Sequence, residues 1–314
     1  MKHIFIINPK AGKRDQTSHI LAMANALRKD HGLECACMLT QSPGHATALA
    51  RKAAETGEEI RVYACGGDGT VYEVANGLAG FENAAMTCIP VGTGNDFLKN
   101  FGDDMGKFSD TENLWDGPAF PLDLIDCNGR YCTTIACSGI DARVAEDVHQ
   151  FSRNPLLTGR GSYLAAAAVN VLFKDITQCW TVTLDDEVVT GDFSLAAVCN
   201  GRYYGGGSTP IPEARMNDGI LNTILIKKID RLAFARLFSD YSAGRYNRLL
   251  HVARVVTAKT IRIQSETDEI VTCLDGETFR SRDVTLRLAE KHVNFFGPAG
   301  CDCNRTARET DGFS

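Results

Sequence analysis

The chain has 314 residues, of which 44% are hydrophobic and 23% are charged. This length and hydrophobic content exclude an intrinsically disordered chain and predict a protein that buries a substantial core in two domains. The formal net charge of −6 and the lack of a long run of Lys and Arg argue against binding to nucleic acid.

The first 120 residues alternate short apolar runs with helical patterns. We expect strands at His3–Ile7, Leu33–Leu39, Arg61–Cys65 and Ala85–Pro90. The expected helices are Thr17–Asp30, His45–Thr56 and a helix that is capped by Thr70 and ends at Leu78. Such alternation is typical of βαβ units, so residues 1–121 are predicted to form an α/β domain with a doubly wound parallel sheet.

From about Leu122 the pattern changes to many short strands separated by turns, which predicts an antiparallel β-sandwich domain over residues 122–288. The expected strands are Phe120–Cys127, Arg130–Cys137, Gln178–Leu184, Glu187–Gly201, Ile220–Lys227, Thr260–Gln264, Ile270–Leu274 and Asp283–Leu288. Helices are expected near Gly161–Phe173 and at Arg231–Leu250. The polar residues 301–314 are expected to form a flexible tail.

The most informative motif is the loop Gly66-Gly67-Asp68-Gly69-Thr70, which joins an apolar strand to a helix. Glycine lets the backbone approach an anion closely, and free N–H groups at a helix start bind phosphate. An aspartate beside phosphates requires a metal ion or a local hydrogen-bond network. The loop has neither the Lys-Ser/Thr ending of a P-loop nor the spacing of G-x-G-x-x-G, so it predicts another type of nucleotide site. Glu73 follows on the first turn of the helix, where the dipole stabilises a carboxylate.

A second loop of this kind, Pro90–Phe97, follows the next strand and offers the hydroxyl of Thr93 and the amide of Asn95. A third, Asn8-Pro9-Lys10-Ala11-Gly12, ends the first strand. Since the carboxyl ends of parallel strands share one edge of a doubly wound sheet, we expect the three loops to meet there. Thr40, which follows another strand, falls on the same edge.

Taken in this order, the three motifs resemble the diacylglycerol kinase catalytic-domain family, which includes bacterial lipid kinases and sphingosine kinases. Further matches along the chain are Asn200–Gly207, Asn217-Asp218-Gly219 and Asp275-Gly276-Glu277. One departure is Tyr72, where the family usually has asparagine. The resemblance extends to about Pro298, and it implies that a strand within residues 289–300 returns to the first domain.

The resemblance implies Mg²⁺-dependent transfer of the γ-phosphate of ATP to a lipid hydroxyl, with diacylglycerol as the first acceptor expected. It implies nucleotide contacts from residues in and beside the three loops: Asn8, Pro9, Lys10, Ala11, Gly12, Thr40, Gly66, Gly67, Asp68, Gly69, Thr70, Glu73, Thr93 and Asn95. Asp68 would also help to hold the catalytic Mg²⁺ through water. A second, structural Mg²⁺ is implied at the Asp218 carboxylate and the backbone carbonyls of Arg215 and Ile220.

Transfer to a lipid hydroxyl needs a carboxylate that orients the hydroxyl and accepts its proton, because such a hydroxyl is a poor nucleophile. The resemblance makes Glu277 the first candidate for this base. Asp275 is the alternate, either as the base or as a partner of the metal and its waters, and the sequence does not separate the two roles. The same residues also fit an Asp-Gly hairpin turn.

The acceptor stays open on the sequence alone. A sphingoid base, a polyprenol or another lipid alcohol would need only an apolar cleft with a hydroxyl-binding mouth, and the first glycine loop also occurs in NAD kinases. A nucleotide-binding regulator without catalysis is a further alternative. Against it, the acidic set Asp68, Asp218, Asp275 and Glu277 is intact.

We expect a cytoplasmic protein that contacts the membrane surface peripherally, because no apolar stretch approaches the roughly 20 residues that span a bilayer and no signal peptide precedes the first strand. The segment Arg231–Arg254 is predicted to be largely helical and mixes arginines with apolar residues. It suits a lipid interface, or else a helix packed on the sandwich with a solvated charged face. Homodimerisation is left open.

Overall fold

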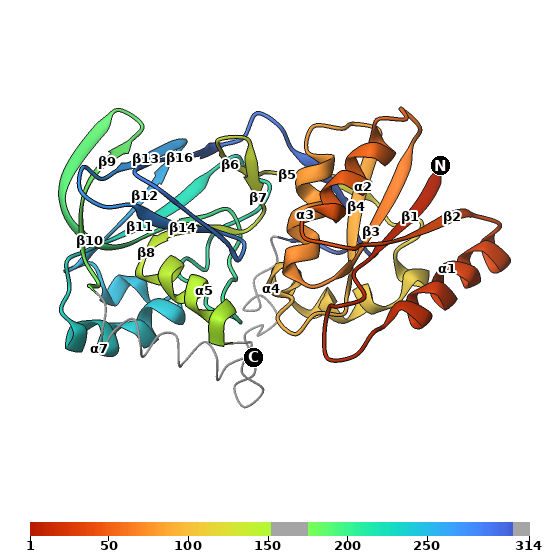
Figure 1. The fold of residues 1–314 in the computed structure, drawn as a ribbon, viewed down its shortest axis with the longest axis horizontal. Coiled ribbons are helices and arrows are strands. Elements are labelled where there is room, and N and C mark those ends of the chain that lie inside the picture. Colours follow the sequence, from red (N-terminus) through yellow and green to blue (C-terminus); the bar gives the residue numbers. More distant parts are fainter. Residues whose placement is uncertain (152–174, 304–314) are drawn as a thin grey trace, which may run out of the picture. The chain divides into compact units, whose positions relative to one another are not determined.

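The computed structural model describes residues 1–151 and 175–303. The chain divides into two compact units, one made of Met1–Leu124 with Glu290–Ser314 and the other of Ile125–Ala289 (Figure 1). Each unit has its own sheet. The helix expected near Gly161–Phe173 and most of the expected tail at 301–314 lie outside the described residues.

The first unit is built on a six-stranded sheet in the order β2-β1-β3-β4-β17-β5. Five strands are parallel: β1 (Lys2–Ile7), β2 (Glu34–Leu39), β3 (Ile60–Gly66), β4 (Ala84–Pro90) and β17 (Val293–Phe296). The edge strand β5 (Ala119–Leu122) runs antiparallel to β17. The predicted parallel α/β sheet is therefore confirmed, and a strand from late in the chain lies inside it.

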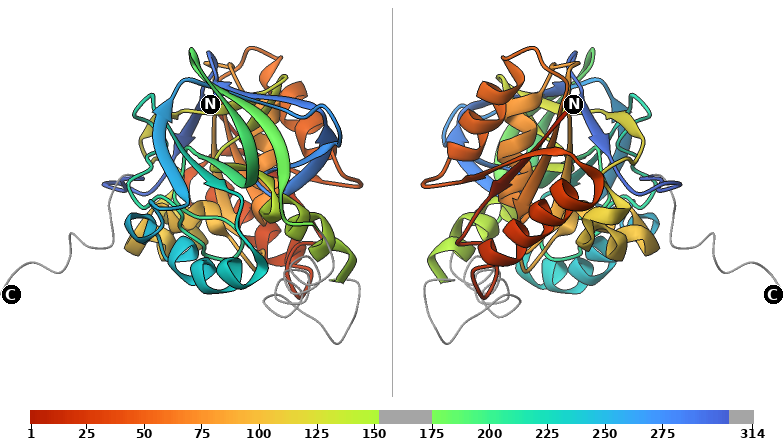
Figure 2. Two further views of the ribbon diagram at one scale, coloured as in Figure 1. Left: turned by 90° about the vertical axis from the view of Figure 1, so that its left-hand side faces the viewer. Right: turned by 90° about the vertical axis from the view of Figure 1, so that its right-hand side faces the viewer.

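Helices cover both faces of this sheet, as right-handed crossovers require (Figure 2). They are α1 (Thr17–His31), α2 (His45–Ala54), α3 (Asp68–Leu78) and the short α4 (Asp96–Lys99), with 3₁₀ segments η1 (Gly102–Ser109) and η2 (Thr111–Asn113). At Gly77 of α3 an added Cβ would lie 2.7 Å from the Cβ of Ala50, so α2 and α3 pack closely only because glycine stands there.

The N-cap of helix α3 lies three residues before the predicted one. Gly67 is its N-cap in an extended conformation, and the N–H of Thr70 donates to the carbonyl of Gly67. The prediction that Thr70 caps the helix is therefore wrong. The glycine supplies the backbone geometry of the cap, and Thr70 lies in the first turn.

The second unit is an eleven-stranded antiparallel sheet. Its strands are β6 (Ile125–Cys127), β7 (Arg130–Cys132), β8 (Ile135–Gly139), β9 (Gln178–Leu184), β10 (Glu187–Cys199), β11 (Leu221–Lys227), β12 (Ala253–Ala258), β13 (Thr260–Gln264), β14 (Ile270–Leu274), β15 (Glu277–Ser281) and β16 (Asp283–Leu288). The order is β15-β14-β8-β10-β9-β13-β16-β6-β7, with β11 beside β10 and β12 beside β11.

The long strand β10 belongs to both halves of this sheet. Its first part, Glu187–Phe193, pairs with β9, and its second part, from Leu195, pairs with β8. A register shift lies between Phe193 and Leu195, where a bulge lets the strand bend. The second part packs into a core with α5 (Ile140–Phe151) and α7 (Arg231–Ser242). This architecture confirms the predicted sandwich-like second domain.

Two predicted strands are each divided. Phe120–Cys127 forms β5 in one unit and β6 in the other. Arg130–Cys137 is interrupted at Thr133 and Thr134, and the chain then continues as β8. Helix α5, which follows β8 directly, was not predicted.

The predicted helix Arg231–Leu250 is also wrong in extent. Helix α7 ends at Ser242, and a 3₁₀ turn, η3 (Tyr246–Arg248), follows. Gly244 adopts a left-handed φ of 68°, and its missing Cβ would lie 2.3 Å from Pro212, so this position breaks the helix. Arg254 lies in β12, where it forms a bidentate ion pair with Glu187.

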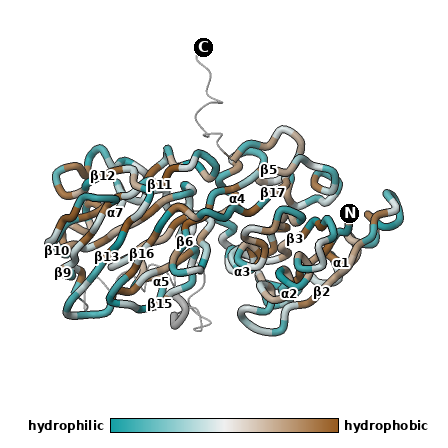
Figure 3. Tube along the Cα trace, turned by 90° about the horizontal axis from the view of Figure 1, so that it is seen from above, coloured by the Kyte–Doolittle hydropathy of each residue, from teal (hydrophilic) through white to brown (hydrophobic). Residues whose placement is uncertain are grey.

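Hydrophobic residues concentrate along the strands of both units, while polar residues prevail in the loops (Figure 3). Among the described helices, none is both long and apolar enough to cross a membrane. All twelve cysteines are free thiols, and most are buried.

Candidate active site

The three predicted loops of the first unit contact one another at the carboxyl ends of β1, β3 and β4. A Cβ added at Gly12 would lie 2.1 Å from the carbonyl oxygen of Val91. A Cβ added at Gly92 would lie 2.5 Å from the Cα of Gly67. These approaches are closer than any side chain permits, so glycine is required for the loops to meet.

The Asn8–Gly12 loop is tied to the start of α3 through Asn8. The Asn8 side-chain amide donates to the Thr70 hydroxyl over 3.3 Å, and the Asn8 carboxamide oxygen accepts from the N–H of Lys10 over 3.0 Å. The N–H of Ala11 donates to the Asn8 carbonyl, which closes a turn through Pro9. The structure therefore brings this loop beside the Gly66–Thr70 loop.

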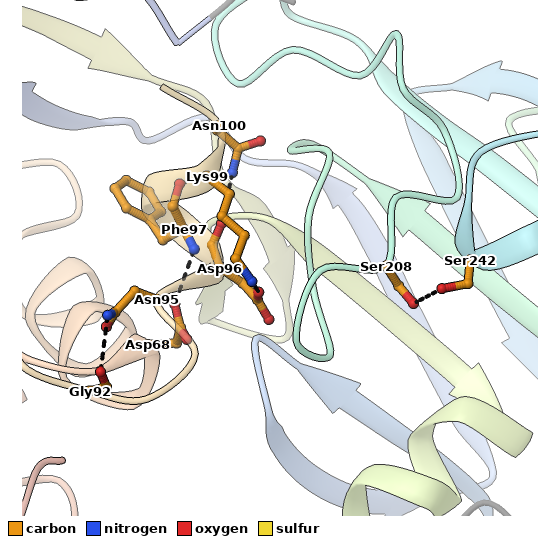
Figure 4. A network of polar contacts seen from close by, with 9 residues as sticks. All are labelled: Asp68, Gly92, Asn95, Asp96, Phe97, Lys99, Asn100, Ser208 and Ser242. Carbon is orange, nitrogen blue, oxygen red and sulfur yellow. Dashed lines mark hydrogen bonds and ion pairs between the residues drawn. The ribbon is translucent and has the colours of Figure 1, made fainter. Parts of the chain in front are cut away.

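Asp68 links the Gly66–Thr70 loop to the Pro90–Phe97 loop. It is the first residue of α3, and its Oδ1 accepts from the N–H of Phe97 over 3.0 Å (Figure 4). At Gly94 an added Cβ would lie 3.0 Å from Asp68 Oδ2. The Thr70 side chain packs against Gly66 in the same way, since a Cβ there would lie 2.1 Å from its Oγ1. The loop around Asp68, including Gly69, is thus compact and made mainly of backbone.

The Pro90–Phe97 loop is closed on itself. Asn95 has a φ of 50°, and its amide donates to the carbonyl of Gly92 over 3.0 Å (Figure 4). The Thr93 side chain is exposed at the tip of the loop. Sequence reasoning did not select Asp96, which is buried and forms an ion pair with Lys99. The sequence signal for Asp96 was its position directly after Asn95, where a helix can start; in the structure Asp96 is the first residue of α4.

Two residues assigned to the nucleotide have other contacts. Glu73 caps α2, because its two carboxylate oxygens accept from the N–H groups of Gly44 and Ala46 over 2.8 and 2.9 Å. Thr40 follows β2, and its N–H donates to the carbonyl of Ile7 over 2.9 Å. Thr40 therefore lies at the same edge of the sheet as the Asn8–Gly12 loop, whereas the Glu73 carboxylate is bound to a neighbouring helix.

In the second unit, Asp275 and Gly276 form the two-residue turn between β14 and β15, with φ values of 47° and 102°. The Asp275 carboxylate accepts five hydrogen bonds from the joint between β7 and β8. The donors are the Thr133 N–H (2.5 Å), the Thr133 hydroxyl (2.8 Å), the Thr134 N–H (3.0 Å), the Thr134 hydroxyl (2.5 Å) and the Ile135 N–H (3.2 Å). A carboxylate has about four lone-pair positions, so this one is saturated.

Glu277 has a different environment. It is the first residue of β15, opposite Leu274, and its side chain is exposed. No hydrogen bond or ion pair joins its carboxylate to the described part of the chain. Only Glu277 of the two candidate bases has lone pairs open to a substrate.

The predicted structural metal ligands lie in one exposed loop. Asp218 Oδ1 accepts from the N–H of Ile220 over 3.0 Å, and Gly219 has a φ of 70°, which is the geometry of an Asx turn. Arg215 lies in the same loop and is exposed. One carboxylate and two carbonyls form a hard oxygen set that suits Mg²⁺. No cluster of three or more His, Cys, Asp or Glu side chains with metal-binding geometry occurs within residues 1–151 and 175–303.

Neutral thiols lie near both aspartates. Burial, and then the charge of Asp68, raises the pKa of Cys88 well above its usual value. Burial, and then the charge of Asp275, does the same to the pKa of Cys132. Neither thiol is therefore a nucleophile at neutral pH, and the chemistry of both regions depends on oxygen groups.

Two family models match this chain in succession. The model described as the diacylglycerol kinase catalytic domain matches residues 2–127, and the one described as the YegS C-terminal NAD kinase beta sandwich-like domain matches residues 134–296. The chain belongs to this lipid kinase family.

Relatives of the family cover most of the chain. The diacylglycerol kinase of Bacillus subtilis (strain 168) is 29% identical over 279 residues, which are 87% of this chain and 88% of that protein. A "Probable lipid kinase YegS-like" of Pseudomonas aeruginosa is 30% identical over 217 residues, which are 68% of this chain and 70% of that protein.

Solved structures share the fold of this family member. The crystal structure of a diacylglycerol kinase from Bacillus anthracis str. Sterne has a TM-score of 0.69 at 23% identity and covers 94% of this chain and 96% of its own. A second crystal structure from the same organism has a TM-score of 0.74 at 25% identity and covers 96% and 98%.

Proposed function

We propose that the protein is an ATP- and Mg²⁺-dependent kinase that phosphorylates a hydroxyl of diacylglycerol and forms phosphatidic acid. One observation carries the proposal: three loops that only glycine allows to approach one another meet beside Asp68 at the end of a parallel sheet. The relatives named diacylglycerol kinase support the choice of acceptor.

In the first unit, the proposal assigns the nucleotide phosphates to N–H groups of Gly67 and Gly69 at the start of α3, where the helix dipole favours anions. The close approach of Gly92 to Gly67 and of Gly94 to Asp68 supports this assignment. Because these positions carry no side chain, backbone groups line this edge of the sheet. Glu73 is left out, since both of its oxygens cap α2.

Mg²⁺, when bound, neutralises charge that develops on the transferred phosphoryl group. Asp68 would hold this ion through water, and the bond from the Phe97 N–H orients its carboxylate for the task. The Asp218 carboxylate, with the carbonyls of Arg215 and Ile220, would hold a second ion with a structural role.

In the second unit, Glu277 would accept the proton of the lipid hydroxyl, because its carboxylate is exposed while that of Asp275 is saturated. The hydroxyl oxygen forms a bond to the γ-phosphorus as the bond from that phosphorus to the bridging oxygen of ADP breaks. The hydroxyl proton passes to the Glu277 carboxylate, and ADP leaves with the bridging oxygen.

The test is incubation of the protein with radiolabelled ATP, Mg²⁺ and a total lipid extract in detergent micelles, followed by identification of the labelled product. Labelled phosphatidic acid supports the proposal. A labelled sphingoid base or polyprenol would support lipid kinase activity but show that the acceptor is not diacylglycerol. Labelled NAD without any lipid product would refute the lipid reaction.

The variant Asp68→Ala tests the nucleotide assignment separately. We expect it to lose both turnover and Mg²⁺-ATP binding, measured by calorimetry with a non-hydrolysable analogue. An unchanged affinity would contradict the assignment of the phosphates to these loops.

A further inference from the structure

The joint between β7 and β8 carries an unusually complete set of polar contacts for a two-residue connection. Thr133 and Thr134 are 4% and 5% exposed, and the N–H and hydroxyl groups of both donate to the Asp275 carboxylate. Asp275 lies about 140 positions later in the chain than the two threonines. The contact is therefore a tertiary clamp and not a local feature of the Asp-Gly turn.

The carbonyl side of the same joint is held by the end of β10. The Asn200 side-chain amide donates to the Thr133 carbonyl over 2.7 Å. The N–H groups of Asn200 and Gly201 both donate to the Thr134 carbonyl over 2.8 Å. Asn200 is fully buried. Every backbone polar group of the two threonines thus has a partner, with Asp275 on one side and Asn200–Gly201 on the other.

An Asp-Gly pair forms a two-residue hairpin turn without outside help, because both residues tolerate positive φ. The clamp is therefore not needed to make the turn. Its effect is to fix where the turn lies relative to β8 and β10. Glu277 is two residues beyond Asp275 and is itself exposed, so its position depends on the turn that the clamp holds.

We infer that Thr133, Thr134 and Asn200 are positioning residues that hold the Asp275 turn in place and thereby orient the Glu277 carboxylate for proton transfer. The inference rests on the proposed function for its catalytic part. Asp275 acts through hydrogen bonds to this joint and takes no proton. A misplacement of about 1 Å in a positioned catalytic group lowers the rate by about 10²-fold, so a clamp of this kind matters for turnover.

The clamp also reaches the glycine-rich segment Gly201–Gly207. This segment starts at the clamp, and its far end is held by a 2.7 Å hydrogen bond between the hydroxyls of Ser208 and Ser242 of α7 (Figure 4). Between these ends, Gly205, Gly206 and Gly207 have positive φ, so the segment is shaped by glycine and anchored at both ends. The same two threonines therefore hold both the turn that carries Glu277 and the start of this segment at Gly201.

A matched pair of variants separates positioning from stability. Thr134→Val removes one hydroxyl at nearly constant volume, and Thr134→Ser keeps the hydroxyl. We expect Thr134→Val to lower kcat about 10-fold or more while KM for Mg²⁺-ATP changes less than about 2-fold. Thr134→Ser should restore kcat to near the wild-type value. A loss of kcat that Thr134→Ser shares, or an equal rise in KM, would overturn the positioning role.

Turnover distinguishes the two carboxylates. If Glu277 is the base and Asp275 positions it, Glu277→Gln should lower kcat by about 10²-fold or more, and Asp275→Asn should lower kcat less because the base remains. A larger loss of kcat in Asp275→Asn than in Glu277→Gln, with the affinity for an ATP analogue unchanged in both, would reverse the roles.

Amide hydrogen exchange tests the clamp without any activity. We expect the amides of residues 133–135 to be protected in the wild type and to exchange at least about 10-fold faster in Asp275→Asn and in Asn200→Asp, while amides of β9 stay unchanged. Fast exchange at 133–135 in the wild type would overturn the clamp. If the protein phosphorylates no lipid yet these amides follow the expectation, the proposed function fails while the clamp stands.

Discussion

Alanine at position 92 should force apart the Gly66–Thr70 and Pro90–Phe97 loops, which the proposed function assigns to the nucleotide phosphates. The new Cβ would lie 2.5 Å from the Cα of Gly67, whereas ordinary van der Waals contact begins at 3.4 Å. The loops would therefore have to separate by 3.4 − 2.5 = 0.9 Å. A displacement of this size costs a positioned reaction about 10²-fold in rate. We expect a comparable loss of kcat/KM for Mg²⁺-ATP in Gly92→Ala.

The matched control is Gly106→Ala in η1 of the same unit. Apart from its chain neighbours and the backbone of its own helix, no heavy atom within residues 1–151 and 175–303 lies within 4 Å of a Cβ built there, and its φ is not positive, so alanine should be accepted without strain. Calorimetry with a non-hydrolysable ATP analogue measures the affinity, and initial rates give kcat/KM. If Gly92→Ala binds the analogue as tightly as Gly106→Ala does, these loops do not bind phosphate.

Three further changes test other parts of the molecule. Glu277→Gln should lower kcat by about 10²-fold or more with an unchanged affinity for the ATP analogue, and retained turnover would exclude it as the base. On the exposed face of α7, where Leu232 is 71% exposed, Leu232→Ser combined with Arg236→Glu should weaken sedimentation with anionic liposomes but spare activity on a short-chain soluble substrate. Burial lowers the pKa of His3 from 6.5 to about 4. Between these pH values the imidazole is protonated in the unfolded chain but neutral in the folded protein, so the free energy of unfolding falls as the pH drops from 6.5 to 4. His3→Phe should remove about 3 kcal/mol of that fall between pH 6.5 and pH 4 in urea titrations, and an unchanged pH dependence would contradict the buried neutral state.

The parallel sheet of the first unit was predictable because its strands are buried apolar runs that end in glycine loops. The joining of those loops followed from one rule, that parallel strands present their carboxyl ends at one edge. The contacts of individual side chains did not follow. Glu73 looked like a phosphate neighbour on a helix start, yet it caps a different helix through Gly44 and Ala46.

The second unit shows where local patterns fail. The break at Thr133 and Thr134 inside an apolar run could not be predicted, because its cause is the carboxylate of Asp275 far along the chain. Helix propensity continued past Ser242, but packing of Gly244 against Pro212 ends the helix there. The roles of Asp275 and Glu277 were likewise inseparable in sequence, since only tertiary contacts distinguish the saturated carboxylate from the exposed one.

The position of β17 has a consequence for how the protein is made. This strand, Val293–Phe296, lies between β4 and β5, so the sheet that carries the three glycine-containing loops stays incomplete until nearly 300 residues have left the ribosome. The other unit, Ile125–Ala289, is continuous in sequence and has all of its strands by then. Biosynthesis therefore reverses the usual order in which the earlier domain folds first, and the unit whose synthesis starts first is the last that can close its sheet.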